Sequence, residues 1–104
     1  MIYNEFNLAG SPRYKFCKFM YYTYVLLSRK DNKFYTGYTG NLQKRLAEHK
    51  SGKVYSTKLR LPLILIYFEV CLNKEDAKAR ERYLKSGMGK RYIKNRLKNY
   101  LKNL

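Results

Sequence analysis

Five side chains, spread along the chain, carry the functional groups that hydrolysis of a phosphodiester bond requires. They are Tyr24, Tyr35, Arg45, His49 and Glu81. The two hydroxyls and the imidazole could activate or orient a water molecule, and the guanidinium could neutralise charge that grows on a phosphate. The carboxylate could hold a metal ion at the leaving oxygen. These groups form a site only if the fold brings them together, so the elements that carry them decide the question.

The single histidine of the sequence lies on a short predicted helix, 42–50. Leu42, Arg45, Leu46 and His49 follow one another at helical spacing and therefore share one face. We expect Arg45 and His49 to lie beside the apolar contacts of this helix, near the sheet. The alternative is a partly buried polar pair that is satisfied by backbone carbonyls.

The sequence has seven carboxylate residues, and most of them have an ordinary explanation in turns or helix caps. Glu81 does not, because its spacing from Ala77 and Leu84 turns it toward the core side of a predicted helix. A carboxylate turned inward in a basic chain needs a cation. A structural salt bridge is the common case, and a divalent metal ion is the functional alternative. Glu69, in a predicted apolar strand, is the second candidate metal ligand.

The two tyrosines fall on a predicted β-hairpin. Residues 21–28 carry bulk on both faces, as in an interior strand, and 33–39 form the returning strand. Tyr24 and Tyr35 share a face if the register permits, and Gly37 predicts either a bulge or a close approach to the backbone. A tyrosine with its ordinary pKa of about 10 is a poor base at neutral pH. A nearby arginine, lysine or metal ion would lower that pKa.

The remaining elements complete the order β-β-α-β-α-α, which places the chain in the α/β (α+β) class. Residues 61–71 are nearly all apolar and predict a strand buried on both faces. A second helix extends to about Ser86, where Gly87 and Gly89 are expected to break it. A last helix, 90–102, carries an apolar stripe with lysines and arginines opposite.

The length of 104 residues suits one domain. Residues 1–19 show no clean period and predict an irregular N-terminal extension, so the single domain is expected over 20–104. Met20 directly precedes the first ordered pattern and is a candidate alternative translation start.

Charge indicates the class of partner. Lys and Arg number 23 against seven Asp and Glu, which gives a formal net charge of +16. A polyanion would relieve this self-repulsion, and nucleic acid is the first candidate because the charge is spread along most of the chain. A generic basic surface and a membrane surface are the alternatives.

Cys17 and Cys71 are interpreted as free thiols, and no membrane span or signal peptide is apparent, so we expect a cytoplasmic protein.

The order of these motifs resembles the GIY-YIG nuclease superfamily, and most closely its small stand-alone bacterial branch related to the nuclease domain of excision-repair proteins. Residues 22–24 (YTY) stand where that family has GIY, and 35–37 (YTG) stand where it has YIG. The stretch NLQKRLAEHKSGK resembles the first helix of the family, with Arg45 and His49 at matching positions. PLILIYFEV and DAKARERYLK resemble the third strand and the helix with the metal-binding glutamate, here Glu81.

The resemblance implies a three-stranded antiparallel sheet flanked by helices. It also implies one Mg²⁺ or Mn²⁺ ion, held by Glu81, and cleavage of DNA that leaves 5′-phosphate and 3′-hydroxyl ends. Tyr24 would be the general base or would orient the attacking water, and Tyr35 and His49 would align the nucleophile and the phosphate. Arg45 would neutralise charge in the transition state.

Nucleic-acid contacts are predicted for the first helix and the basic loop 51–58, which we expect to be flexible. The candidates are Lys44, Lys50, Lys53, Tyr55, Lys58 and Arg60. Tyr55 could stack on an exposed base, which would favour single-stranded or distorted DNA. With no separate reader module expected, sequence specificity should be low.

Two alternatives to an endonuclease stay open. The first is a non-enzymatic nucleic-acid-binding protein on the same fold. The second is a membrane-surface or partner-binding role for the basic C-terminal helix.

Overall fold

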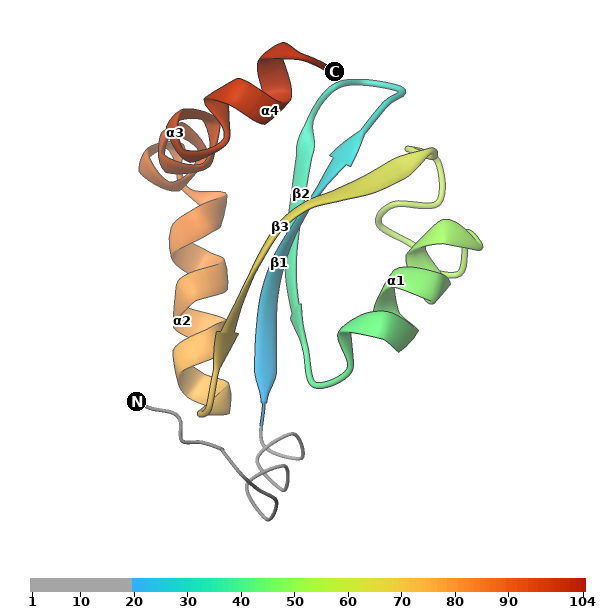
Figure 1. The fold of residues 1–104 in the computed structure, drawn as a ribbon. Helices are drawn as coiled ribbons and strands as arrows, with labels where there is room; N and C mark the ends of the chain where they lie inside the picture. The colour runs from blue at the N-terminus through green and yellow to red at the C-terminus, as the bar shows by residue number, and fades with distance from the viewer. Residues whose placement is uncertain (1–19) are drawn as a thin grey trace, which may run out of the picture.

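The computed structural model describes residues 20–104 as a three-stranded antiparallel sheet with helices on both faces (Figure 1). The strands are β1 (Tyr21–Ser28), β2 (Phe34–Thr39) and β3 (Leu63–Cys71), in the spatial order β2-β1-β3. The helices are α1 (Leu42–Lys50), α2 (Lys74–Lys85), α3 (Gly87–Arg96) and α4 (Lys98–Lys102). The predicted fold class and element order are confirmed, with a short helix added at the C-terminus. The predicted N-terminal extension, Cys17 included, lies outside the described residues.

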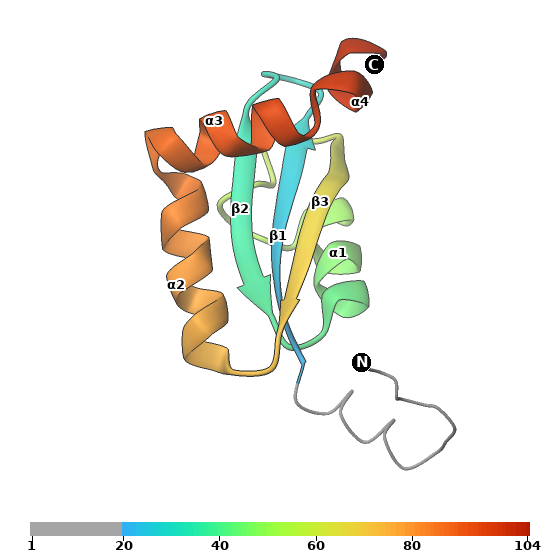
Figure 2. The same ribbon diagram turned by 60° about the vertical axis from the view of Figure 1, so that its left-hand side comes forward.

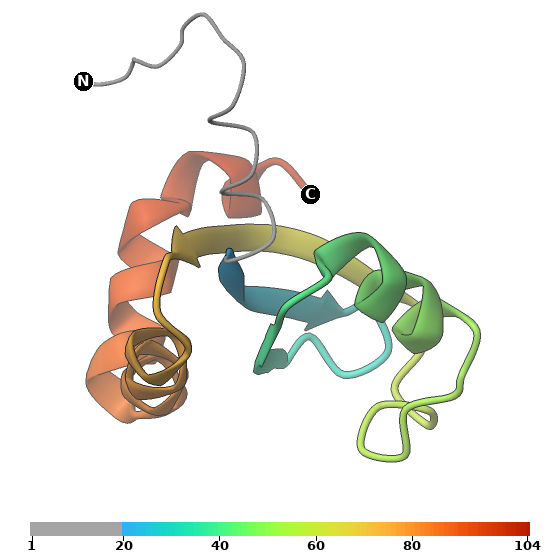
Figure 3. The ribbon, with the colours of Figure 1, turned by 90° about the horizontal axis from the view of Figure 1, so that it is seen from below.

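Strand β1 is the centre of the molecule. It pairs with β2 on one side and β3 on the other, and its residues from Thr23 to Ser28 are all buried. Viewed along the strands, α1 lies on one side of the sheet and α2 and α3 lie on the other (Figure 3). The prediction of an interior strand at 21–28 is therefore confirmed.

Alternate residues of β1 hold the two helical layers. Tyr24 and Leu26 face α1, where the partly buried Leu42 and Leu46 pack against them. Val25 faces the other layer, where it forms a cluster with Leu84 of α2 and Ile93 of α3. Full burial of an aliphatic side chain of this size stabilises by about 1.5–3 kcal/mol. The predicted apolar faces of α1 and α2 therefore account for how both helices are held.

One polar bond adds to the α2 layer. The hydroxyl of Thr23, fully buried, donates to the backbone carbonyl of Ala77 in α2 at 2.9 Å. Thr23 and Tyr24 are neighbours in the chain. Strand β1 therefore contacts α2 through Thr23 and α1 through Tyr24 at the same level of the sheet.

The prediction that residues 61–71 form a strand buried on both faces is wrong. Strand β3 begins at Leu63 and is an edge strand, and Phe68 and Val70 are 47% and 45% exposed. The apolar residues of 61–71 correctly predicted a strand, but they do not indicate how many strands pair with it. The central place belongs to β1, which pairs on both sides.

The prediction that Gly87 and Gly89 break the second helix is wrong in its mechanism. The chain turns at Ser86, which ends α2 and caps α3, and both glycines lie in the first turn of α3 (Figure 2). A Cβ on Gly89 would lie 2.1 Å from the carbonyl oxygen of Tyr83, so glycine lets α3 pack directly on the end of α2. The predicted last helix instead divides at Leu97, between α3 and α4.

Candidate active site

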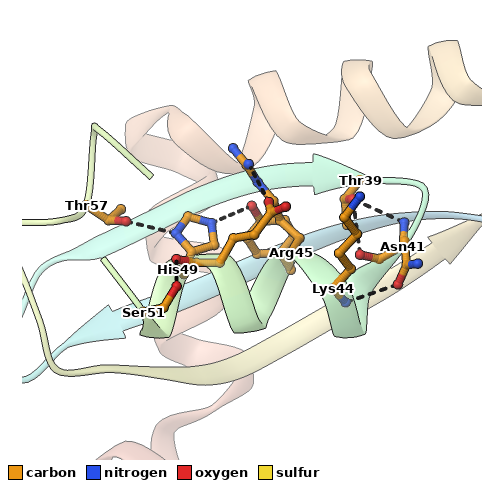
Figure 4. A network of polar contacts seen from close by, with 9 residues as sticks. Thr39, Asn41, Lys44, Arg45, His49, Ser51 and Thr57 are labelled. Carbon is orange, nitrogen blue, oxygen red and sulfur yellow. Dashed lines mark hydrogen bonds and ion pairs between the residues drawn. The ribbon is translucent and has the colours of Figure 1, made fainter. Parts of the chain in front are cut away.

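A chain of three side chains connects the sheet, α1 and the loop that follows α1. The hydroxyl of Tyr24 lies 2.8 Å from Nε2 of His49, and Nδ1 of His49 lies 2.8 Å from the hydroxyl of Thr57. His49 and Thr57 are fully buried, and Tyr24 is 1% exposed. Figure 4 shows His49 reaching Thr57 from the last turn of α1. The imidazole therefore has both nitrogens engaged and no room to rotate.

Tyr35 joins this group from β2. In the β1–β2 register Tyr24 is opposite Gly37 and Leu26 is opposite Tyr35, so the two tyrosines share a face as predicted. The Tyr35 ring centroid lies 6.5 Å from that of Tyr24 and 5.2 Å from that of His49. The two tyrosines and the histidine are therefore mutual neighbours.

Gly37 makes the position of Tyr24 possible. A Cβ at Gly37 would lie 2.6 Å from the Tyr24 hydroxyl oxygen, so any larger residue would overlap the ring. Of the two predicted roles of this glycine, close approach is the correct one. The irregularity of the sheet lies elsewhere, between Val25 and Leu26 in the pairing of β1 with β3.

Arg45 lies one helical turn before His49 and is partly exposed. It makes an ion pair with Glu48 at 3.0 Å, and its positive charge acts to lower the pKa of Tyr24. The prediction that Arg45 and His49 share the sheet-facing side of α1 is confirmed. Their hydrogen-bond partners are side chains. The alternative of a polar pair satisfied by backbone carbonyls is therefore wrong.

Burial controls the protonation of the site. Desolvation raises the pKa of Tyr24 to about 12, and Tyr35 and Glu81 add to this effect, while the nearby Arg45 opposes it. Burial, with help from Arg45, lowers the pKa of His49 to about 4. The imidazole is therefore neutral near pH 7. The expected lowering of the tyrosine pKa by arginine is present, but desolvation outweighs it.

Glu81 is the carboxylate of α2 whose charge reaches Tyr24. It extends from α2, is 17% exposed, and acts on Tyr24 through its negative charge. Its Oε2 lies 3.1 Å from Nζ of Lys85, and no other polar partner of this carboxylate is found among residues 20–104. One carboxylate oxygen thus has no partner in the described part of the chain.

The donor chemistry at Glu81 fits a hard divalent cation. Such ions prefer oxygen ligands, and Mg²⁺ commonly takes one or two carboxylates while water and substrate phosphate complete its shell. Within the described residues no cluster of three or more His, Cys, Asp or Glu side chains is present. A cation at Glu81 would therefore depend on a phosphate for much of its binding.

Glu69, the second candidate ligand, serves a different purpose. Its carboxylate accepts hydrogen bonds from Arg80 at 2.9–3.1 Å and from the Tyr67 hydroxyl at 2.8 Å. Although burial acts to raise it, these donors hold the pKa of Glu69 below its usual value. Both carboxylate oxygens are occupied, so Glu69 is a structural anion that connects β3 to α2.

Most of the predicted nucleic-acid-binding residues are exposed on α1 and the following loop. These are Lys44, Lys50, Lys53, Tyr55 and Lys58, and Tyr55 is 84% exposed with the Lys58 ammonium 4.8 Å from its ring centroid. Arg60 does not join them. Its guanidinium binds Asp31 at 3.2 Å and the carbonyl of Phe34 at 3.3 Å, beside a pocket lined also by Lys90 and Lys94.

The loop itself is anchored at two points. Val54 and Thr57 are buried, while Tyr55 and Lys58 between and after them point outward. Thr57 is the site residue that the sequence analysis missed. A lone threonine in a loop has no periodicity to mark it, and the one available signal is its spacing of three from the apolar Val54, which is buried in the same turn.

Comparison with known families identifies the domain to which this fold belongs. The model of the GIY-YIG catalytic domain matches residues 20–96, so the chain belongs to the GIY-YIG family. None of the helices in the described region is long and apolar enough to cross a membrane, and Cys71 there is a free thiol.

Bacterial proteins named UPF0213 are similar to this chain. One from Clostridium perfringens is 45% identical over 67 residues, which is 64% of this chain and 71% of that protein. One from Staphylococcus haemolyticus is 42% identical over 67 residues, or 64% of this chain and 80% of that protein. The solution NMR structure of a UPF0213 protein from Bacillus halodurans is 34% identical, with a TM-score of 0.45 and coverage of 71% of this chain and 81% of that one.

Proposed function

We propose that this chain is a divalent-metal-dependent endonuclease that hydrolyses phosphodiester bonds in DNA and leaves 5′-phosphate and 3′-hydroxyl ends. The observation that carries the proposal is the Tyr24 hydroxyl, held 2.8 Å from His49 beside Arg45, Tyr35 and Glu81, on a GIY-YIG catalytic domain. A base, a cation for the phosphate and a metal ligand converge there, as phosphodiester hydrolysis requires.

In this proposal the hydroxyl proton of Tyr24 first passes to solvent, and the resulting phenolate accepts the proton of the attacking water. The water oxygen bonds to phosphorus, the bond from phosphorus to O3′ breaks, and O3′ leaves as a hydroxyl after it takes up a proton. Arg45 neutralises charge on the non-bridging oxygens in the transition state. Tyr35 and His49 align the nucleophile and the phosphate, because both rings lie against Tyr24.

A Mg²⁺ or Mn²⁺ ion held by Glu81 would supply positive charge to the phosphate and the leaving oxygen. Lys85, the present partner of Glu81, is 56% exposed at its side chain and can turn into solvent when Glu81 is used as a ligand. Positive charge near Tyr24 also lowers a tyrosine pKa, which opposes the effect of burial.

Substrate binding is expected to depend mainly on phosphate contacts, with low sequence specificity. The exposed cations of α1 and its loop are Lys44, Lys50, Lys53 and Lys58. Each phosphate neutralised should reduce log affinity by about 0.9 per log unit of salt on duplex DNA and about 0.7 on single strands. We assign Arg60 a lesser role, because its guanidinium is already bound to Asp31.

The decisive experiment is cleavage of end-labelled single-stranded and duplex DNA with Mg²⁺ or Mn²⁺, comparing wild type with Glu81→Gln. Glu75→Gln is the matched control, since Glu75 is an exposed carboxylate on the same helix. We expect metal-dependent cutting by wild type and Glu75→Gln, and none by Glu81→Gln. Wild type that binds DNA but cuts neither substrate with either metal would favour the non-enzymatic alternative. Undiminished cutting by Glu81→Gln would reject Glu81 as the metal ligand.

Tyr55 tests the preference for unpaired bases. Stacking of one base on an aromatic side chain contributes about 1–3 kcal/mol, so Tyr55→Ala should weaken single-strand binding by about tenfold and duplex binding much less. Tyr100→Ala, at an exposed tyrosine of α4, is the control. Unchanged single-strand affinity of Tyr55→Ala would exclude stacking on this ring.

A further inference from the structure

A pocket lined by basic side chains lies at the end of β2 that adjoins the β1–β2 turn. Lys33 belongs to this turn, and Arg60 belongs to the loop after α1. Lys90 and Lys94 belong to α3, which crosses the sheet at this end of β2 (Figure 2). Within the described residues Asp31 is the one carboxylate of the lining, so the pocket has a formal charge of +3.

The arginine and the aspartate of this pocket are bound to each other. Nε of Arg60 donates to the Asp31 carboxylate at 3.2 Å, and a second guanidinium nitrogen donates to the carbonyl of Phe34 at 3.3 Å. The same carboxylate accepts from the backbone N–H of Lys33 at 2.9 Å. Arg60 and Asp31 therefore cancel in charge and hold the turn against β2. The charge that remains for a ligand is carried by the three lysines.

The three lysines have no counter-charge of their own. Among residues 20–104, none of Lys33, Lys90 and Lys94 makes an ion pair with a carboxylate. All three are exposed, and Lys90 and Lys94 lie one helical turn apart, where like charges repel each other. Lysines dispersed in solvent over a convex surface are the ordinary case, but a concave surface lined by one sign of charge concentrates its field. The pocket therefore favours an anionic ligand.

The position of the pocket relative to the candidate active site indicates which anion it fits. Phe34 lines the pocket, Tyr35 is the next residue of β2, and Gly37 lies opposite Tyr24. A strand rises by about 3.3 Å per residue, so the pocket and the level of Tyr24 are about 10 Å apart along β2. One strand of DNA carries a phosphate for about every 3.4 Å of its axis, so about three nucleotides span this distance. Because β2 is an edge strand of the described sheet, no further strand separates a substrate that lies along it from either position.

We propose that this pocket binds a backbone phosphate of the DNA substrate, about three nucleotides from the phosphate that is cut. Lys33, Lys90 and Lys94 supply the positive charge, and Arg60 holds the turn that carries Lys33. The cations of α1 and its loop, on the other face of the sheet, bind a different part of the same substrate (Figure 3). This inference rests on the proposed nuclease function for the place of the cut, but binding of a phosphate by the pocket does not require cleavage.

DNA binding in EDTA, without divalent metal, tests the pocket separately from cleavage. The dissociation constant of the full chain for labelled single-stranded and duplex DNA is measured over a range of salt concentrations, for wild type and for Lys90→Gln/Lys94→Gln. Loss of one phosphate contact should lower the slope of log affinity against log salt by about 0.9 on duplex DNA and about 0.7 on single strands. Near 0.1 M salt this change corresponds to binding that is weaker by about five- to tenfold.

Lys74→Gln/Lys78→Gln is the matched control. It removes the same charge at the same helical spacing from the start of α2, at the opposite end of the sheet from the pocket (Figure 2). The control should keep the wild-type slope. A wild-type slope and affinity in Lys90→Gln/Lys94→Gln would overturn the proposal, and so would an equal loss in the control, since only total charge would then matter. Because both pocket lysines are exposed and repel each other, their replacement should leave the unfolding free energy unchanged or slightly higher.

Inorganic phosphate distinguishes the two sources of a phosphate group, the DNA backbone and a small free compound. We expect millimolar phosphate to shift the backbone amide signals of Lys33, Lys90 and Lys94 in ¹H–¹⁵N spectra weakly and without saturation. A saturable shift, together with unchanged DNA binding in Lys90→Gln/Lys94→Gln, would assign the pocket to a free phosphate compound and reject the proposal. A reduced salt slope in that variant, in a chain that cuts no DNA with Mg²⁺ or Mn²⁺, would support the phosphate pocket and reject the proposed nuclease function.

Discussion

Replacement of Gly37 by alanine tests the central geometry of the site with a single methyl group. The added Cβ would lie 2.6 Å from the Tyr24 hydroxyl oxygen and 2.8 Å from its ring carbon Cζ. Comfortable contact begins at about 3.5 Å, so the end of the ring must retreat by about 0.9 Å. Tyr24 is 1% exposed and has no free space to retreat into without disturbing His49.

The size of that movement sets the expected effect. A displacement of about 0.9 Å is large compared with the tolerance of the 2.8 Å Tyr24–His49 hydrogen bond, so this bond would be disrupted. Overpacking costs about 1–3 kcal/mol, and removing a glycine from a strand returns about 0.5–1 kcal/mol. We therefore expect Gly37→Ala to lower the unfolding free energy by about 1–2 kcal/mol and the cleavage rate by about a hundredfold.

Urea unfolding and single-turnover DNA cleavage measure the two effects. Gly87→Ala is the control, because a Cβ there meets nothing within 4 Å and Gly87 is helical. That variant should cleave normally and be slightly more stable. Wild-type cleavage by a folded Gly37→Ala chain would refute the reasoning, since the tyrosine position would then not matter to the chemistry.

Three further outcomes follow from the same contacts. Tyr24→Phe leaves Nε2 of buried His49 without a partner, so cleavage should be lost and urea unfolding should show a loss of about 1–3 kcal/mol. Burial lowers the pKa of His49 to about 4, whereas a histidine in the unfolded chain has a pKa of about 6.5. Between about pH 6.5 and about pH 4, His49 is therefore protonated in the unfolded chain but not in the folded one. Stability should therefore fall as pH decreases from about 6.5 to about 4 in urea titrations, by up to about 3 kcal/mol, and His49→Gln should lack this component. Glu69→Gln should cost about 1–2 kcal/mol through Arg80 and leave the cleavage rate of folded protein unchanged; a specific loss of cleavage would mean that Glu69 acts in the site.

Periodicity predicted the parts of the site that regular elements carry. Tyr24 and Tyr35 share a face because strand side chains alternate and the hairpin register is short-range. Arg45 and His49 share a face because they are four residues apart on α1. These relations are local consequences of backbone geometry, so one sequence is enough to read them.

Long-range and irregular features were less accessible. The edge position of β3 depends on which strand pairs on both sides, and an apolar run such as 63–71 does not carry that information. Thr57 meets His49 through a loop whose path is set by tertiary contacts. Gly89 reads as a helix breaker, but its absent side chain serves the close packing of α3 on α2.

The contact of Thr23 with Ala77 has a consequence for how this family can diverge. Thr23 and Tyr24 are consecutive residues that point to opposite faces of β1. One binds the carbonyl of Ala77, a single helical turn before Glu81, and the other binds His49. One peptide unit therefore fixes the spacing between the proposed base and the proposed metal ligand. Exposed residues of the loop 51–62 can change without altering this spacing, on which the proposed reaction depends.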